Sequence, residues 1–144
     1  MSDNVFKRIL VGVDDSEDSL LALKYAIHTA KEDDSELIIA SILEDNTMNV
    51  YEALSKDYIH GERKDLEKHV LQYKKLAEDA GVNNVSAVVD EGAPGETIIK
   101  SVIPAFNPDL LVIGSEARKG VRKHFGSQAS YMAKYADISV MIFR

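Results

Sequence analysis

The sequence predicts an α/β fold: an open, Rossmann-like, five-stranded parallel sheet with helices on both faces. Short apolar runs rich in β-branched residues recur along the chain, and such runs are typical of strands buried on both faces. Longer segments with helical spacing of apolar residues lie between them. This alternation favours right-handed strand–helix–strand units and therefore a parallel sheet. No linker, repeat or low-complexity tract interrupts it, so residues 1–144 are predicted to form a single domain.

The N-terminal part is expected to begin with a strand, a helix and a second strand. The first apolar run spans residues 8–14, and Ser16 is the predicted N-cap of the helix, ahead of acidic first-turn residues. The predicted buried face of that helix consists of Leu20, Leu23, Ile27 and Ala30. Glu36–Leu43 is the second strand. Residues 48–60 show no clean period and are interpreted as a loop or an irregular helix start.

A long helix is expected next, ending at Gly81, since glycine is favoured just past a helix C-terminus. Its predicted apolar face consists of Leu66, Val70, Tyr73, Ala77 and Ala80. Another helix opens at Pro94, and Pro104 is expected to end or kink it. The remaining predicted elements are strands at 85–92, 109–114 and 138–143 and a helix at 126–135.

Composition excludes several classes of function. The formal net charge of -7 disfavours binding to nucleic acid or to an anionic membrane, so any anion site requires a local basic patch. The absence of cysteine excludes disulfides, thiol nucleophiles and cysteine-ligated metals. No apolar leader and no run long enough to span a membrane is present, so a cytoplasmic location is expected.

The predicted fourth strand leads into the best candidate site. In open α/β sheets, ligands bind beyond the carboxyl ends of the strands, where strand order reverses. Gly114 ends this strand, and Gly126-Ser127 open a helix whose first-turn amides could hold a phosphate. The basic residues between them are Arg118, Lys119, Arg122, Lys123 and His124. A solvated basic loop flanked by turn glycines explains the same pattern, and neither standard phosphate-binding glycine motif is present.

With these elements in place, the sequence resembles the universal stress protein family over essentially its whole length. The resemblance is carried by "ILVGVDDSEDSLLALKYAI", by "EGAPGETII", and by "DLLVIGS", "FGSQA" and "ISVMIF" near the C-terminus. It implies a five-stranded parallel sheet and a homodimer formed through the last strand, residues 138–143. Some family members bind ATP through a G-x2-G-x9-G-[ST] loop, whereas others lack this motif and do not bind it.

The resemblance also implies the residues of an adenine-nucleotide site. Asp14 would accept hydrogen bonds from the ribose hydroxyls, and Ile42 would face the adenine. A turn or helix-capping role is the alternative for Asp14. The full implied set is Gly12, Val13, Asp14, Ile42, Gly114, Ala117, Arg118, Gly126, Ser127, Gln128 and Ala129. The implied ligand is ATP, ADP or AMP, with Mg²⁺ held by its phosphates and a single carboxylate.

The loop departs from the family motif at two points. Ala117 replaces the second glycine, and eight residues rather than nine separate it from Gly126. Gly120, midway between Gly114 and Gly126, is a candidate for restoring the lost flexibility. Two functions therefore remain open: an ATP-binding homodimeric stress regulator, or a dimeric interaction module that has lost ATP binding. No catalytic constellation is found, so hydrolysis is expected to be slow at most, and the fold alone supports no enzyme assignment.

Overall fold

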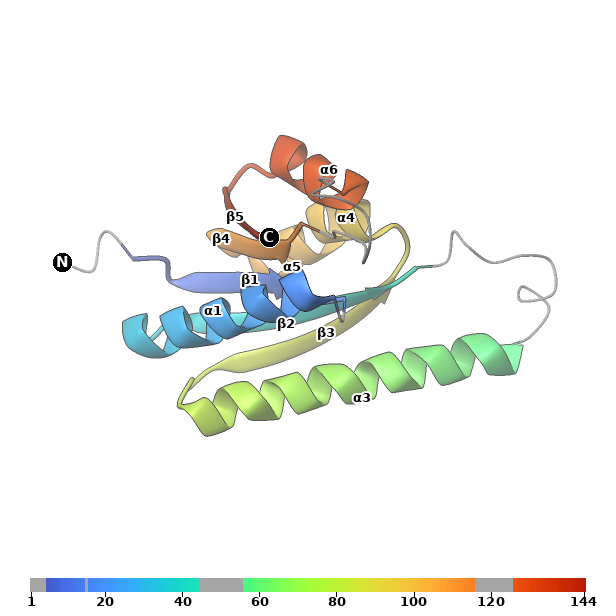
Figure 1. Ribbon diagram of the computed structural model, residues 1–144, viewed down its shortest axis with the longest axis horizontal. Coiled ribbons are helices and arrows are strands. Elements are labelled where there is room, and N and C mark those ends of the chain that lie inside the picture. Colours follow the sequence, from blue (N-terminus) through green and yellow to red (C-terminus); the bar gives the residue numbers. More distant parts are fainter. Residues whose placement is uncertain (1–4, 15, 45–55, 116–125) are drawn as a thin grey trace.

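The computed structural model describes residues 5–14, 16–44, 56–115 and 126–144, with the side chains of 56–62 left aside. Five parallel strands form one sheet in the order β3-β2-β1-β4-β5 (Figure 1). The strands are β1 (Arg8–Gly12), β2 (Glu36–Leu43), β3 (Val85–Glu91), β4 (Leu110–Gly114) and β5 (Ser139–Phe143). The predicted parallel α/β fold is confirmed.

Strand order reverses between β1 and β4. The chain moves from the central β1 outward to β2 and β3, and then crosses back to β4 on the other side of β1. Leu10 of β1 is paired with Ile38 of β2 and with Leu111 of β4. The carboxyl ends of these three strands therefore meet at the switch point, where α/β proteins bind ligands.

Helices cover both faces of the sheet (Figure 1). One face carries α1 (Glu17–Asp33) and α3 (Lys56–Ala80). The other carries α4 (Pro94–Thr97), the π-helix η2 (Ile98–Val102), α5 (Ile103–Phe106) and α6 (Ser127–Tyr135). The two cores alternate along β1, since Ile9 and Val11 pack toward α1 while Leu10 packs toward η2. All three side chains are fully buried.

The start of α1 confirms the predicted cap and corrects the predicted buried face. The Ser16 hydroxyl accepts a hydrogen bond from the backbone N–H of Ser19. Leu20, however, is 36% exposed, and Ser19 takes the inward position of the first turn. The Ser19 hydroxyl bonds the carbonyl of Ser16 and the N–H of Asp14, which holds it on the sheet side. At 3.6 residues per turn, the next residue then points away from the core.

The ends of α3 also refine the prediction. The helix begins at Lys56, so 56–60 are helical, whereas 48–55 lie outside the described residues. Ala80 is exposed, contrary to the prediction. Gly81 reverses the chain at φ +112°, and Val82 follows it into the core with 4% exposure. The N–H of Val82 donates to the carbonyl of Ala77, so Val82 supplies the apolar contact that was assigned to Ala80.

Pro104 does not end the helical backbone. Proline lacks an N–H and its ring crowds the carbonyl four residues earlier. The preceding segment, η2, widens into π-helical winding, with the N–H of Ile103 donating to the carbonyl of Ile98. α5 then carries the helix to Phe106, and Asn107 ends it in a left-handed conformation. Of the two predicted outcomes, an end of the helix at Pro104 is wrong, because the helix passes through it with wider winding ahead of the proline.

Candidate ligand-binding site

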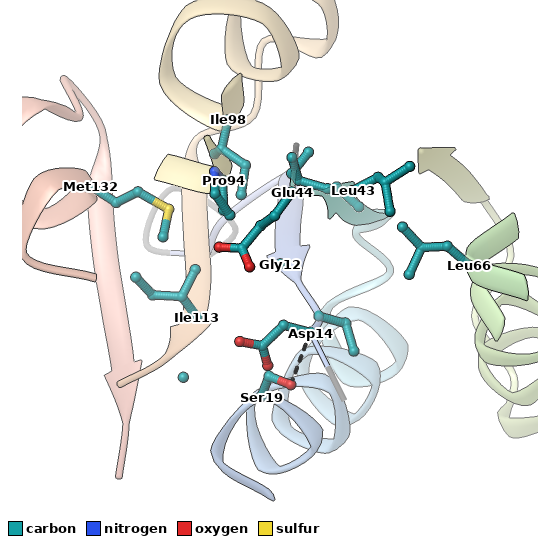
Figure 2. A pocket seen from close by; sticks show the side chains of 14 residues that line it. Gly12, Asp14, Ser19, Leu43, Glu44, Leu66, Pro94, Ile98, Ile113 and Met132 are labelled. Atoms are coloured by element: carbon teal, nitrogen blue, oxygen red, sulfur yellow. Dashed lines mark hydrogen bonds between the residues drawn. The ribbon is translucent and has the colours of Figure 1, made fainter. Parts of the chain in front are cut away.

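A cavity of about 350 Å³ lies at the carboxyl ends of β1, β2 and β4 (Figure 2). Gly12 and Gly114 form part of its wall, at the point where strand order reverses. A cavity of this volume falls in the range that accommodates small-molecule ligands. The residues nearest the switch point therefore enclose a space large enough for a ligand.

Nine of the fourteen residues that line the cavity have apolar side chains. On the side of α4 and α6, the wall is formed by Ala40, Ile42, Pro94, Ile98, Ile113 and Met132. On the side of α1 and α3 it is formed by Val13, Leu43 and Leu66. Figure 2 shows the Met132 thioether and the Ile113 side chain facing the interior from one side, and Leu66 from the other. A flat, weakly polar group such as a nucleobase suits such a wall.

Leu66 is held at the cavity by contacts between α3 and the edge strand β3. The guanidinium of Arg63, one turn earlier, pairs with the carboxylate of Glu91. Its Nη2 also lies 3.4 Å from the carbonyl oxygen of Val89. The hydrogen bond to Glu91 raises the pKa of Arg63. A guanidinium is cationic throughout the ordinary pH range, so Arg63 keeps its charge in this pair.

Asp14 is both a turn residue and part of the cavity wall. Its Oδ1 accepts hydrogen bonds from the N–H of Ser16 at 3.0 Å and from the Ser16 hydroxyl at 2.6 Å. The alternative turn role of Asp14 is therefore present in the structure. Among the described residues no group donates to Oδ2, so this oxygen is available to a ligand.

Gly114 is required by the close approach of α1 to the end of β4. A Cβ atom at this position would lie 2.6 Å from the backbone nitrogen of Ser19 and 2.7 Å from the carbonyl carbon of Asp18. Both are backbone atoms, which cannot swing aside. Packing against the first turn of α1 therefore explains the glycine at 114, in addition to its predicted place in a ligand site.

The N-terminus of α6 adjoins the cavity through Ser115. The carbonyl of Ser115 accepts a 2.9 Å hydrogen bond from the N–H of Gly126, which is the N-cap of α6. The N–H of Ser115 donates to the carbonyl of Phe143 at 2.8 Å. Residues on either side of the 116–125 segment are thus joined directly. Gly126 has no side chain that could cap α6. The free amides in the first turn of a helix readily donate hydrogen bonds to an anion.

The structure brings together part of the predicted set. The predicted residues that line the cavity are Gly12, Val13, Asp14, Ile42 and Gly114. Gly126 and Ser127 lie at the α6 N-terminus rather than in the lining. The side-chain oxygen of Gln128 accepts a 2.7 Å hydrogen bond from Gly95, and Ala129 is fully buried in the core. Ala117, Arg118, Gly120 and the other basic residues of that loop lie outside the described residues.

Several lining residues are not in the predicted set. Ser19, Glu44 and Met132 are the ones that most affect the chemistry. Glu44 stands at a strand end, and that position is the signal that could have found it. Met132 has no such signal, because helical spacing marks it as apolar and inward-facing but not which surface it meets.

The described residues contain neither a metal-binding cluster nor a helix that could span a membrane. Within the described ranges, no three His, Asp or Glu side chains gather as a metal-binding group. None of the described helices combines the length and the apolar character that crossing a membrane requires.

Comparison with known proteins was made on sequence and on fold. A protein of Staphylococcus aureus strain USA300, assigned to the universal stress proteins, is 27% identical over 140 residues, which cover 96% of this chain and 84% of that protein. UspA of Lactobacillus plantarum superimposes with a TM-score of 0.86 at 20% identity, covering 99% of this chain and 100% of the other.

Two further solved structures contain nucleotides. The universal stress protein of Archaeoglobus fulgidus in complex with dAMP gives a TM-score of 0.67 at 15% identity, over 97% of this chain and 99% of the other. A universal stress protein in complex with cAMP gives a TM-score of 0.71 at 21% identity, over 98% of both chains. At these identities the likeness establishes the fold. The family model for the universal stress protein family matches residues 6–144, and this chain therefore belongs to that family.

Proposed function

We propose that this protein binds an adenine nucleotide, ATP in particular, and acts as a stress-response regulator. The observation that carries the proposal is the cavity at the β1–β4 switch point, which has a carboxylate at its rim and a helix N-terminus beside it. Apolar side chains, a carboxylate and helix first-turn amides suit, respectively, the base, the sugar and the phosphates of a nucleotide.

Each part of the nucleotide has a suitable set of neighbours. The base would lie against the apolar wall that includes Ile42 and Ile98. The ribose would donate from its hydroxyls to Oδ2 of Asp14, since an ionised carboxylate is an acceptor only. The phosphates would lie toward Gly126 and Ser127, where the α6 dipole and first-turn amides favour negative charge. Relatives with the same fold that were solved with dAMP and with cAMP support binding of an adenine nucleotide.

Mg²⁺ would accompany ATP rather than occupy a site of its own. This cation commonly uses one or two carboxylates together with substrate phosphates and waters. Asp14, on the cavity rim, is assigned to the ribose, so the phosphates and waters would supply most of the ligands of this cation. The proposal is a binding role with slow hydrolysis at most, since the described residues that line the cavity include no nucleophile paired with a general base.

Calorimetric titration of nucleotide-stripped protein with ATP, with and without Mg²⁺, tests the proposal. Binding in the micromolar range is the expected result. If no heat is released and millimolar ATP leaves the melting temperature unchanged, the proposal is wrong, because a ligand that binds only the folded state must stabilise it.

A dimeric interaction module without nucleotide is the second candidate. Ala117 and the loop shortened by one residue favour it. Two contacts in the structure also favour it. Gln128 binds the N–H of Gly95 and Ala129 is buried in the core, so neither side chain is free to contact a ligand. The same titration separates the two functions.

Both candidates include a homodimer formed through β5. This strand pairs with β4 on one side and has no strand on its other side among the described residues. Its residues Val140, Met141 and Ile142 are half-buried and apolar. An edge strand of this kind is a natural site of self-association, and pairing two copies would extend the sheet symmetrically.

A further inference from the structure

We propose that Glu44 determines the base specificity of the cavity by accepting a hydrogen bond from the exocyclic amino group of a purine. This inference rests on the proposed nucleotide binding and assigns a role to a residue outside the implied site. Glu44 directly follows β2 and lines the cavity together with Asp14 and Ser19.

Both carboxylate oxygens of Glu44 are unused among the described residues, whereas Asp14 has one unused oxygen and the Ser19 hydroxyl is engaged. The Ser19 hydroxyl donates to the carbonyl of Ser16 and accepts from the N–H of Asp14. Asp14 uses Oδ1 to hold Ser16. Glu44 is exposed, and in the described part of the chain its carboxylate forms no hydrogen bond and no ion pair. Its acceptors are therefore open to a ligand.

The Glu44 carboxylate is directed to the apolar side of the cavity. Side chains at Ile38, Ala40 and Ile42 of β2 pack in the core beneath α4 and α6, as strand alternation requires. Glu44 follows two residues after Ile42, and Figure 2 shows its carboxylate turned toward the space beside Pro94 and Met132. Leu43 points the opposite way, toward Leu66 on α3.

The two carboxylates are consequently placed for different parts of a nucleoside. Asp14 stands at the start of α1, where its turn with Ser16 fixes it. Glu44 stands beside the apolar wall that suits a flat ring. A carboxylate accepts and cannot donate, so it favours an amino group on that ring over a hydrogen atom or an acceptor at the same position.

Electrostatics restricts the alternatives. The described lining contains Asp14 and Glu44 and no lysine or arginine. Placing a phosphate there would bring like charges together in a partly enclosed space, which is unfavourable. Base and ribose are the uncharged parts of a nucleotide that can approach Glu44 while offering donors, and the ribose is already assigned to Asp14.

The experiment compares two ligands on three proteins. The ligands are ATP and purine riboside 5′-triphosphate, in which hydrogen replaces the 6-amino group. The proteins are the wild type, Glu44→Ala and the matched control Asp14→Asn. Dissociation constants are measured by calorimetry. The ratio of the two constants is compared, because the effect of removing one negative charge on a triphosphate is the same for both ligands.

Removal of the amino group should weaken binding to the wild type about tenfold, as for a hydrogen bond to a charged acceptor. The ratio should fall to within about twofold of unity in Glu44→Ala and stay near tenfold in Asp14→Asn. Melting curves of the ligand-free variants show whether each is folded.

The unfavourable outcomes separate the two proposals. If the wild type does not bind ATP, the proposed function is wrong and the Glu44 role falls with it. If ATP binds and Glu44→Ala keeps the wild-type ratio, nucleotide binding stands and the Glu44 assignment is wrong. A third ligand, 2′-deoxy-ATP, tests whether Glu44 contacts the ribose instead. If the wild type binds ATP more tightly than 2′-deoxy-ATP and Glu44→Ala does not, Glu44 lies at the ribose and the base assignment is wrong.

Discussion

The hydroxyl of Ser115 donates a 2.6 Å hydrogen bond to Oδ2 of Asp18, joining the end of β4 to the first turn of α1. The two residues are 97 positions apart in the sequence. Ser115 is 3% exposed, and its backbone also bonds Gly126 and Phe143. A single buried serine thus connects α1, β5 and the N-terminus of α6 around the switch point of the sheet.

Gly114→Ala should destabilise the protein, because the added Cβ would lie 2.6 Å from the backbone nitrogen of Ser19. Relieving this overlap requires β4 and α1 to separate, which would also stretch the bond between Ser115 and Asp18. A loss of about 1–3 kcal/mol in the free energy of unfolding is expected, as for other overpacked sites. Urea denaturation monitored by circular dichroism measures it.

Gly12→Ala is the matched control, since this glycine lines the same cavity. Its added Cβ would meet only side-chain atoms, 3.2 Å from Cδ1 of Ile98 and 3.5 Å from Cγ2 of Ile113. These methyl groups can shift, so the loss of stability should be well below that of Gly114→Ala. Equal losses in the two variants would show that contact with the α1 backbone is not what requires glycine at 114.

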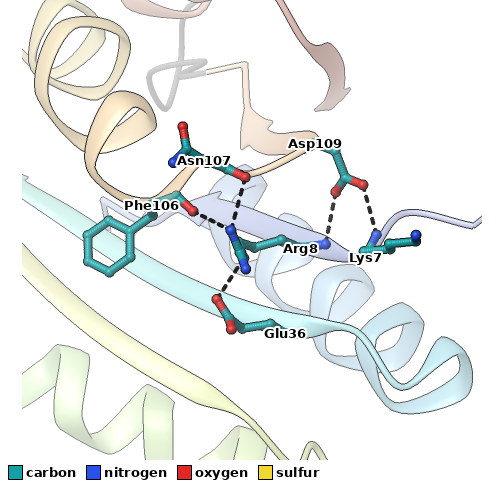
Figure 3. Close-up of polar contacts among 6 residues, drawn as sticks. All are labelled: Lys7, Arg8, Glu36, Phe106, Asn107 and Asp109. Atoms are coloured by element: carbon teal, nitrogen blue, oxygen red, sulfur yellow. Dashed lines mark hydrogen bonds and ion pairs between the residues drawn. The ribbon is translucent and has the colours of Figure 1, made fainter.

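Asp109→Asn should weaken the opposite end of the sheet without affecting ligand binding. The two carboxylate oxygens of Asp109 accept 2.9 Å hydrogen bonds from the N–H groups of Lys7 and Arg8 (Figure 3). Asparagine retains one acceptor but turns an NH₂ group toward the second N–H. A loss of about 1–2 kcal/mol is expected for a partly buried site of this kind.

The control for this variant is Asp79→Asn, which removes an exposed ion pair with Lys75 at 3.6 Å. Such i,i+4 pairs contribute about 0.3–0.5 kcal/mol, so this variant should denature almost as the wild type does. Denaturation midpoints of the two variants, measured side by side, provide the comparison. If Asp109→Asn is no less stable than Asp79→Asn, its carboxylate does not fix the start of β1.

Asp14→Asn should weaken binding of adenosine while leaving affinity for inorganic triphosphate nearly unchanged. Asparagine can keep an oxygen at the Oδ1 position, where it holds Ser16, but presents NH₂ in place of the Oδ2 acceptor. The turn should therefore persist while the proposed ribose contact is lost, at a cost of about tenfold in affinity. Calorimetric titration of both ligands tests this, and equal losses for the two would contradict the ribose assignment.

Gly126→Val should reduce nucleotide affinity with little effect on the fold. Gly126 has φ -62° and ψ 149°, a conformation open to any residue, so the substitution introduces no backbone strain. Its side chain would stand at the α6 N-terminus, where the phosphates are proposed to lie. The cost to the helix should stay within about 1 kcal/mol, as for the loss of a favourable N-cap residue. Unchanged ATP affinity in a folded variant would remove Gly126 from the site.

The strands could be predicted from sequence because each is a compact apolar run bounded by polar or glycine residues. Glu36–Leu43 was predicted residue for residue. Helix faces were less predictable, since Leu20 and Ala80 continue the apolar spacing but lie where a helix begins or ends. There, a bonded serine or the glycine turn decides which residue faces inward. Such contacts are tertiary and leave no trace in periodicity.

The cavity was predictable only in part for the same reason. Strand-end residues such as Gly12 and Asp14 could be placed, because parallel strands bring their carboxyl ends to one edge. Met132 and Leu66 reach the cavity through the packing of α6 and α3, which spacing does not specify. Gln128 shows the reverse case. It follows the predicted phosphate-binding loop in the sequence, but its side chain binds the backbone of Gly95 in the structure.

Ile142→Pro should weaken the proposed dimer while leaving the protomer folded. The carbonyl of Phe143 accepts from Ser115 and so faces β4. Backbone polar groups alternate in direction along a strand, so the N–H of Ile142 points to the outer edge of the sheet. Proline there removes a donor for a second copy without removing a bond to β4, and edge strands tolerate it.

Met141→Pro is the matched control: it removes an N–H that faces β4 and should destabilise the protomer. Sedimentation equilibrium should show a concentration-dependent dimer for the wild type and a shift toward monomer for Ile142→Pro. A wild-type mass equal to one chain at every concentration, or an Ile142→Pro variant that dimerises as well as the wild type, would exclude β5 as the interface.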